Sequence, residues 1–194
     1  MSYPEALQIV YNKQLLTSNE CESIFGAHQK AEIKKGDFLL KENQIAREYY
    51  VLESGLLRAY VFDFNKLDIT TNFFTANEVV IEVASLFRQI PSQENIQALT
   101  DCVLWKIEFN TFQKLFHELK AMREWGRSWF VMQLISSKQR AIEMITVSAK
   151  ERYLRLVKEK PFIIQHAPLK TIAAYLGITD TSLSRLRKEI ADKI

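Results

Sequence analysis

The sequence predicts an α+β protein in which an N-terminal β-roll of the jelly-roll type is followed by one long helix and a small helical unit. Three observations support this order. Short runs rich in Val, Ile, Tyr, Phe and Leu, separated by turn residues, occupy about 33 to 107, as in compact antiparallel sheets. From about 112 to 145 there is no proline and a single glycine, which is typical of helix. Residues 168–190 contain two amphipathic segments with a glycine between them, the pattern of two short helices joined by a tight turn.

The strand-rich region divides at pairs of turn-forming residues. Its runs are KKGDFLLKE, EYYVLESGLLRAYVFDF, DITTNFF and ALTDCVLWKIEF, and the turn pairs are Gly36–Asp37, Ser54–Gly55, Asn65–Lys66 and Ala76–Asn77. Turns at such close intervals are typical of a β-roll. Residues 5–28, which precede the strands, are predicted to be helical, with Thr17 or Ser18 as the N-cap of a second short helix.

The long helix is predicted over about 119–146 and is apolar on two flanks. One stripe consists of Met122, Trp125, Gly126, Trp129, Gln133 and Ser136, and a neighbouring stripe consists of Phe130, Leu134, Ile135, Ile142 and Ile145. A helix with two apolar flanks usually has two partners. The predicted partners are its own β-roll and the same helix of a second subunit, related by a two-fold axis. The alternative is one broad stripe against one core in a monomer.

The C-terminal segment has the form of a helix-turn-helix. Gly177 supplies the positive φ that ends the first helix, and Thr179 is a good N-cap for the second, which is predicted over 179–193. The apolar positions at helical spacing are Ile172, Ala173 and Leu176 in the first helix and Leu183, Leu186 and Ile190 in the second. Each helix therefore has one side to bury.

Another face of the second helix is polar and basic. It carries Thr181, Ser184, Arg185 and Lys188 at i, i+3, i+4 and i+7. Hydroxyls and cations on a helix that is anchored by its apolar side suit the major groove of DNA. The alternative is an ordinary helical hairpin with a solvated polar face.

A further helix is predicted to begin at the capping-box sequence Ser148–Glu151 and to stop at Pro161. Together with the helix-turn-helix it makes a three-helix unit. The predicted domains are therefore a sensor domain, 1–146, and a DNA-binding domain, 147–194, with a hinge near Thr146–Ser148.

The charge distribution points to the same C-terminal segment. The net charge of the chain is +3. Residues 146–194 hold ten Lys and Arg against five Asp and Glu, whereas residues 1–145 hold sixteen against eighteen. A local excess of positive charge is the electrostatic footprint expected of a nucleic-acid-binding part.

Other classes of protein lack support in the sequence. No run approaches the 18 or so apolar residues of a membrane-spanning helix, and no secretory signal is visible at the start. The isolated Cys21 and Cys102 fit a reduced compartment, so the cytoplasm is the predicted location. The histidines are far apart and predict no metal site, and no nucleophile–base or phosphate-loop motif indicates an enzyme.

The order of elements, together with IAAYLGITDTSLSRLRK and KKGDFLLKE…YYVLESGLLRAY, resembles the Crp/Fnr family of bacterial transcription regulators. The resemblance covers nearly the whole chain. It implies a cyclic-nucleotide-binding-type β-roll, a homodimer formed through the long helix, double-stranded DNA and RNA polymerase as partners, and an effector that reorients the DNA-binding domains. The DNA-binding positions that it implies are Thr179, Thr181, Ser182, Ser184, Arg185 and Lys188, with the fork of Arg185 on a guanine.

The predicted effector pocket departs from this family. Cyclic-nucleotide binders carry a Gly-Glu pair and, further along the chain, an Arg that binds the cyclic phosphate. Glu82 keeps the position that would bind a ribose hydroxyl, but Ile81 replaces the Gly and Ser92 replaces the Arg. Without the Arg, the charge of a buried phosphate stays uncompensated. The pocket positions implied by the resemblance are Glu82, Val83, Ala84, Ser92 and, on the long helix where relatives bind the base, Ser136 and Ser137.

The predicted function is that of a homodimeric, sequence-specific DNA-binding transcription regulator with little or no response to cAMP, and no cofactor is predicted. Any small-molecule effector is not identified by the sequence. The alternative is a small-molecule sensor whose helix-turn-helix no longer binds DNA specifically.

Three positions that are glycine in the family are Asn43, Asn65 and Asn77, and these are expected to take left-handed turn conformations.

Overall fold

The structure is a computed structural model, and it describes residues 3–191. Two helices and a short 3-10 turn come first: α1 (Glu5–Val10), η1 (Lys13–Leu15) and α2 (Ser18–Gly26). The strands are β1 (Gln29–Ile33), β2 (Phe38–Leu40), β3 (Glu48–Ser54), β4 (Leu57–Phe62), β5 (Asp68–Phe74), β6 (Val79–Val80), β7 (Asn95–Ala98) and β8 (Cys102–Glu108). The other helices are α3 (Val83–Arg88), between β6 and β7, and then α4 (Phe109–Glu118), α5 (Lys120–Thr146), α6 (Ala149–Glu159), α7 (Pro161–His166), α8 (Leu169–Tyr175) and α9 (Asp180–Ala191).

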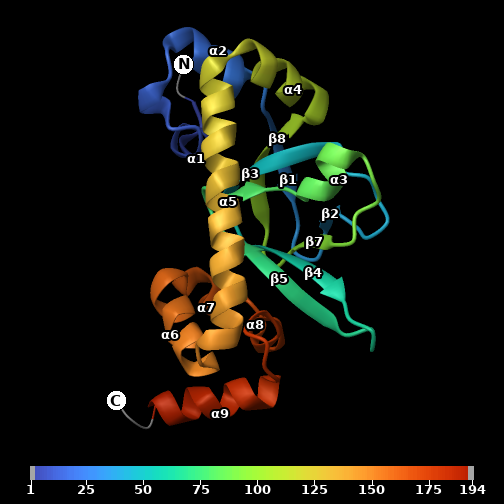
Figure 1. Cartoon of the computed structure of the whole chain (residues 1–194), viewed down its shortest axis with the longest axis vertical. Helices are drawn as coiled ribbons and strands as arrows, with labels where there is room; N and C mark the ends of the chain where they lie inside the picture. Colours follow the sequence, from blue (N-terminus) through green and yellow to red (C-terminus); the bar gives the residue numbers. More distant parts are fainter. Residues whose placement is uncertain (1–2, 192–194) are drawn as a thin grey trace.

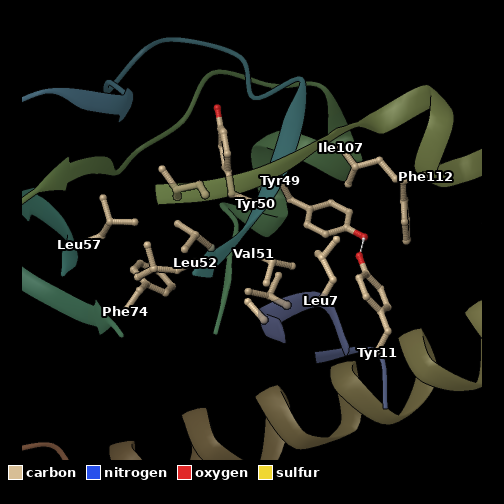
Figure 2. Packing of buried hydrophobic residues seen from close by; sticks show 14 of the residues in the cluster. Leu7, Tyr11, Tyr49, Tyr50, Val51, Leu52, Leu57, Phe74, Ile107 and Phe112 are labelled. Carbon is tan, nitrogen blue, oxygen red and sulfur yellow. Dashed lines mark hydrogen bonds between the residues drawn. The ribbon is translucent and has the colours of Figure 1, made fainter. Parts of the chain in front are cut away.

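The strands form two four-stranded antiparallel sheets, in the orders β1-β8-β3-β6 and β2-β7-β4-β5. Side chains of both sheets share one buried cluster, shown in Figure 2, which includes Leu52 and Val51 of β3, Leu57 of β4 and Phe74 of β5. The predicted β-roll is thus confirmed, and its strands extend a few residues beyond the predicted limits. Figure 1 shows both sheets on one side of the long helix α5, with α9 lying across the far end of the molecule.

Two of the three asparagine positions take the predicted left-handed conformation. Asn43 has φ 69° and Asn77 has φ 67°. The prediction for Asn65 is wrong, because the positive φ in that turn, 62°, belongs to Lys66. The side chain of Asp63 accepts hydrogen bonds from the backbone amides of Asn65 and Leu67, and this Asx-type turn moves the left-handed residue one position along the chain.

The N-terminal helices are anchored to the β-roll. Thr17 is the N-cap of α2, in a reciprocal capping box with Glu20. Of the two predicted N-cap residues, Thr17 and Ser18, the structure thus has Thr17. The Tyr11 hydroxyl, at the end of α1, lies 2.6 Å from the Tyr49 hydroxyl of β3, as the dashed line in Figure 2 shows. Burial raises the pKa of Tyr11 well above its ordinary value, so this pair stays protonated and acts as a neutral cross-link between helix and sheet.

The long helix α5 has one buried flank and one exposed flank. Met122 and Gly126 are buried, and Trp125 packs beside them and donates its indole N–H to the Val10 carbonyl at 2.8 Å. Phe130, predicted for the second flank, instead packs on Phe87 of α3. Gln133 and Ser136, predicted for the first flank, are exposed. No helix within residues 3–191 is long and apolar enough to cross a membrane.

The C-terminal unit, defined here as α6 to α9, begins as predicted with a Ser148–Glu151 capping box. It contains one more helix than predicted, because Pro161 does not simply stop α6 but occupies the first turn of α7, where its missing N–H costs no hydrogen bond. The helix predicted over 179–193 is present as α9, and its last positions, 192 and 193, lie outside the described residues.

Candidate nucleic-acid interface and effector cavity

The turn between α8 and α9 has the hydrogen bonds of a Schellman motif. The Ile178 N–H donates to the Ala173 carbonyl at 3.0 Å and the Gly177 N–H donates to the Ala174 carbonyl at 3.1 Å. Gly177 has φ 68°, a conformation that residues with a Cβ seldom adopt. The glycine therefore fixes the angle at which α9 leaves α8.

The N-terminus of α9 is capped by its own side chains. Thr179 Oγ1 accepts the Ser182 N–H at 3.1 Å, and the hydroxyls of these two residues lie 2.9 Å apart. Asp180 accepts the Thr181 N–H at 2.9 Å, so its carboxylate faces the positive end of its helix. Thr179 and Ser182 thus have a capping role, and their predicted contacts with DNA stay predictions.

The predicted DNA-binding face of α9 is open to solvent. Leu183 is fully buried, and Leu186 and Ile190 pack against the same cluster, so the opposite side of the helix points outward. The exposed residues are Thr179, Thr181, Ser182, Ser184, Arg185 and Lys188. The Arg185 guanidinium makes no hydrogen bond or ion pair with any residue in 3–191. It is therefore available to an external partner.

Two backbone amides at the N-terminus of α3, beside the predicted pocket residue Glu82, are already occupied. Glu82 is the N-cap of α3, and its carboxylate accepts the Ala84 N–H at 3.2 Å and also the Ser85 N–H. A phosphate bound at the N-terminus of α3 would accept hydrogen bonds from these amides. The carboxylate of the chain itself takes that place here, and Val83 and Ala84 are exposed.

Ser92, at the position of the missing Arg, is buried and closes a turn of its own. Its hydroxyl donates to the Glu94 carbonyl at 2.7 Å and accepts the Glu94 N–H at 3.0 Å. Burial, with a further contribution from the Glu82 carboxylate, raises the pKa of Glu94. This side of the site therefore adds carboxylates where a phosphate would need cations.

A cavity of about 1010 Å³ lies where strands of both sheets meet the β2–β3 loop and the start of α4. Its apolar walls include Leu40, Val80, Ile81 and Ile96, and its polar walls include Tyr50, Arg47, Glu48, Glu82 and Glu108. The Glu48 carboxylate accepts from the Tyr50 hydroxyl at 2.6 Å and from Lys106 at 3.2 Å. Three carboxylates and one guanidinium in the walls disfavour an anionic ligand.

Of the six predicted pocket residues, only Glu82 lines this cavity. Ser136 and Ser137 are exposed on α5 and are not among the lining residues. Glu48 and Tyr50 line the cavity but were not predicted from the sequence. Their two-residue spacing on a strand, which places both on one face, is the signal that would have found them.

Comparisons with known proteins agree with this architecture. Residues 30–118 match the family model of the cyclic nucleotide-binding domain. A curated relative, the cAMP-dependent protein kinase type II regulatory subunit of Drosophila melanogaster, is 23% identical over 111 residues, which are 57% of this chain and 28% of that protein. The chain thus spans well under half the length of that relative.

Solved structures with the same fold cover nearly the whole chain. FixK2 from Bradyrhizobium japonicum is 16% identical with a TM-score of 0.72, over 86% of this chain and 85% of that one. CooA from Carboxydothermus hydrogenoformans, solved as a mutant, is 16% identical with a TM-score of 0.66, over 99% and 85%. A protein from Eubacterium rectale assigned to the Crp/Fnr family of transcriptional regulators is 17% identical with a TM-score of 0.72, over 95% and 87%.

Residues 30–118 are therefore similar to cyclic nucleotide-binding domains, and the chain as a whole has the fold seen in solved structures of Crp/Fnr transcription regulators. At these identities the structural likeness establishes the fold alone. The resemblance found in the sequence is confirmed at that level.

Proposed function

We propose that this protein is a cytoplasmic transcription regulator that binds specific double-stranded DNA as a homodimer, and that cAMP does not control it. The exposed hydroxyl-and-cation face of α9, held by a buried apolar stripe, is the observation that carries the proposal. A face of this kind on the second helix of a helix-turn-helix suits the major groove. RNA polymerase is the further partner that the fold suggests.

The dimer is supported by the exposed flank of α5. Leu134 is 70% exposed and Ile145 is 87% exposed. The other exposed apolar residues of this helix are Val131, Met132, Ile135, Ile142 and Met144. An apolar stripe along a surface helix favours packing against the same helix of a second copy, which would present two α9 helices to one duplex.

Selection from a random duplex library by the full-length protein tests this function. A homodimer is expected to enrich an inverted repeat whose half-sites lie about one helical turn, roughly 10 base pairs, apart. Retention of every duplex equally, with no enriched sequence, would contradict the proposal. That result would favour a small-molecule sensor whose helix-turn-helix does not bind DNA specifically.

A further inference from the structure

The cavity of about 1010 Å³ described above has an ordered wall. Part of this wall belongs to the β2–β3 loop, residues 41–47, which is tied to two helices. The Ala46 N–H donates to Ser85 Oγ of α3 at 2.8 Å, and the Arg47 carbonyl accepts the Phe109 N–H of α4, also at 2.8 Å. A loop held at both points keeps its shape without a ligand, as in most small-molecule sites, which are largely formed in advance.

One part of the cavity wall is apolar. Leu40 of β2, Val80 of β6 and Ile96 of β7 line the cavity, and all three side chains belong to the buried core cluster of the β-roll. They come from both sheets. The cavity therefore combines the size of a small-molecule site with apolar surface against which the body of a ligand can be buried.

Tyr50 adds a polar group to this wall. Its side chain is only 9% exposed, and Figure 2 shows its hydroxyl pointing away from the hydroxyls of Tyr11 and Tyr49, since successive residues of a strand point to opposite faces. The hydroxyl donates to the Glu48 carboxylate at 2.6 Å. Burial, together with this hydrogen bond to Glu48, raises the pKa of Tyr50 well above its ordinary value. The phenol therefore stays neutral, and its oxygen can still accept a hydrogen bond from a ligand.

Two carboxylates that line the cavity lie opposite each other in the sheet. Glu48 of β3 and Glu108 of β8 are direct partners in the antiparallel register, and like charges at such positions repel each other. Lys106 compensates Glu48, with its Nζ 3.2 Å from Glu48 Oε2. Glu108 is exposed, forms no ion pair with any residue in 3–191, and its side chain does not cap α4, which follows it. Within the described residues, Glu108 thus has no cation paired with it.

We propose that this cavity binds a small organic cation, a molecule with an apolar body and one ammonium group. The body packs against the three apolar residues from β2, β6 and β7. The ammonium group lies at Glu48 and Glu108, where it offsets the repulsion between the two carboxylates. Arg47, a cation among the lining residues, opposes this binding. Binding at this site requires neither DNA nor the proposed function.

Titration of the full-length protein, without DNA, with three probes of equal chain length tests the proposal. The probes are octylammonium, octanol and octanoate, which differ in the charge of their polar end. By calorimetry, octylammonium is expected to bind about ten-fold more tightly than octanol, and octanoate is expected not to bind. The NMR methyl signals of Leu40 and Ile96 should shift with octylammonium. Equal affinities for the three probes, or shifts confined to methyl groups of α5, would overturn the proposal.

Two variants with opposite expected effects complete the test. Glu108→Gln should weaken octylammonium binding about five- to ten-fold, a value between those of an exposed and a buried charged contact, and should leave octanol binding unchanged. Arg47→Gln should strengthen octylammonium binding about two- to five-fold, because it removes a like charge. Glu22→Gln is the matched control, since Glu22 is exposed on α2 and does not line the cavity. An equal loss in the control, or unchanged affinity in both cavity variants, contradicts the proposal.

Discussion

His28 and Tyr11 form a buried hydrogen bond, with 3.0 Å between the imidazole Nε2 and the phenol oxygen. The other ring nitrogen of His28 lies 2.7 Å from the Ile24 carbonyl. Both nitrogens are therefore used inside the core, and burial lowers the pKa of His28 from 6.5 to about 4. The imidazole is neutral in the folded protein at neutral pH.

This shift predicts loss of stability in mild acid. Between the unfolded pKa of 6.5 and the folded pKa of about 4, the unfolded chain binds a proton that the folded chain does not. The free energy of unfolding should therefore fall by about 2 kcal/mol between pH 7 and pH 5 through this residue alone. Denaturant titrations of the wild type and of His28→Gln measure it. Equal pH dependence in the two proteins would contradict the assignment.

Close packing at Gly126 predicts a second effect on stability. A Cβ at this position would lie 2.7 Å from Cε2 of Phe116, so an added methyl must displace the ring. Gly126→Ala should lower the free energy of unfolding by about 1–3 kcal/mol, despite the better helix propensity of Ala. Gly26→Ala is the control, because nothing lies within 4 Å of its added Cβ, and it should be neutral or slightly stabilising. A neutral Gly126→Ala would contradict this account.

Local signals in the sequence were enough to predict the helix-turn-helix. Gly177 allows the positive φ of the turn, and the Thr179 hydroxyl caps the second helix. The apolar stripe that includes Leu183 identifies which side of that helix is buried. The error at α7 has the same local origin. Proline ends one helix and also suits the first turn of the next, and the sequence around Pro161 does not separate these two roles.

Contacts between distant segments were not predicted. Phe73 and Phe74, side by side on β5, point to opposite faces of a strand, and two large apolar neighbours indicate that both faces are covered. This signal for docking of the C-terminal unit was present in the sequence, but the segment that covers Phe73 lies about 100 positions later and no local pattern identifies it. Ser136 and Ser137 were assigned to the effector pocket by the family resemblance; they do not line the cavity described above, and their role in binding an effector stays a prediction.

The exposed apolar flank of α5 is predicted to be required for dimerisation. Leu134→Glu places a charge in the middle of the stripe on both subunits, and the dissociation constant should rise about 100-fold or more, or about 3 kcal/mol. Sedimentation velocity over a concentration series measures it. Phe64→Glu is the control, because Phe64 is 95% exposed on the β4–β5 hairpin and is not part of α5, and it should leave the dimer intact. A wild-type protein that is monomeric at every concentration would contradict the prediction.

Because the amides at the N-terminus of α3 are occupied, we expect the protein not to bind cyclic nucleotides. Glu82 caps the helix and occupies the Ala84 and Ser85 amides, and Ser92 satisfies its own turn. A cyclic phosphate would therefore meet occupied amides and, in the cavity walls, one guanidinium against three carboxylates. Calorimetric titration with cAMP and with cGMP should show no heat of binding up to about 1 mM, which corresponds to a binding free energy weaker than about −4 kcal/mol. Micromolar binding would show that Glu82 leaves the cap when a nucleotide enters.

The guanidinium of Arg185, which is exposed and pairs with no residue in 3–191, predicts a loss of specificity rather than of general affinity. Arg185→Ala should reduce affinity for the selected duplex by about 1–3 kcal/mol and relax the preference at one base pair of each half-site. Lys188→Ala should weaken binding to all duplexes alike and reduce the salt slope by about 1, because a phosphate contact carries no sequence information. Lys30→Ala removes the same charge from the exposed strand β1 and is the control, measured by competition with random duplex. If Arg185→Ala and Lys30→Ala bind the selected and random duplexes with the same ratio as the wild type, Arg185 does not contact the bases.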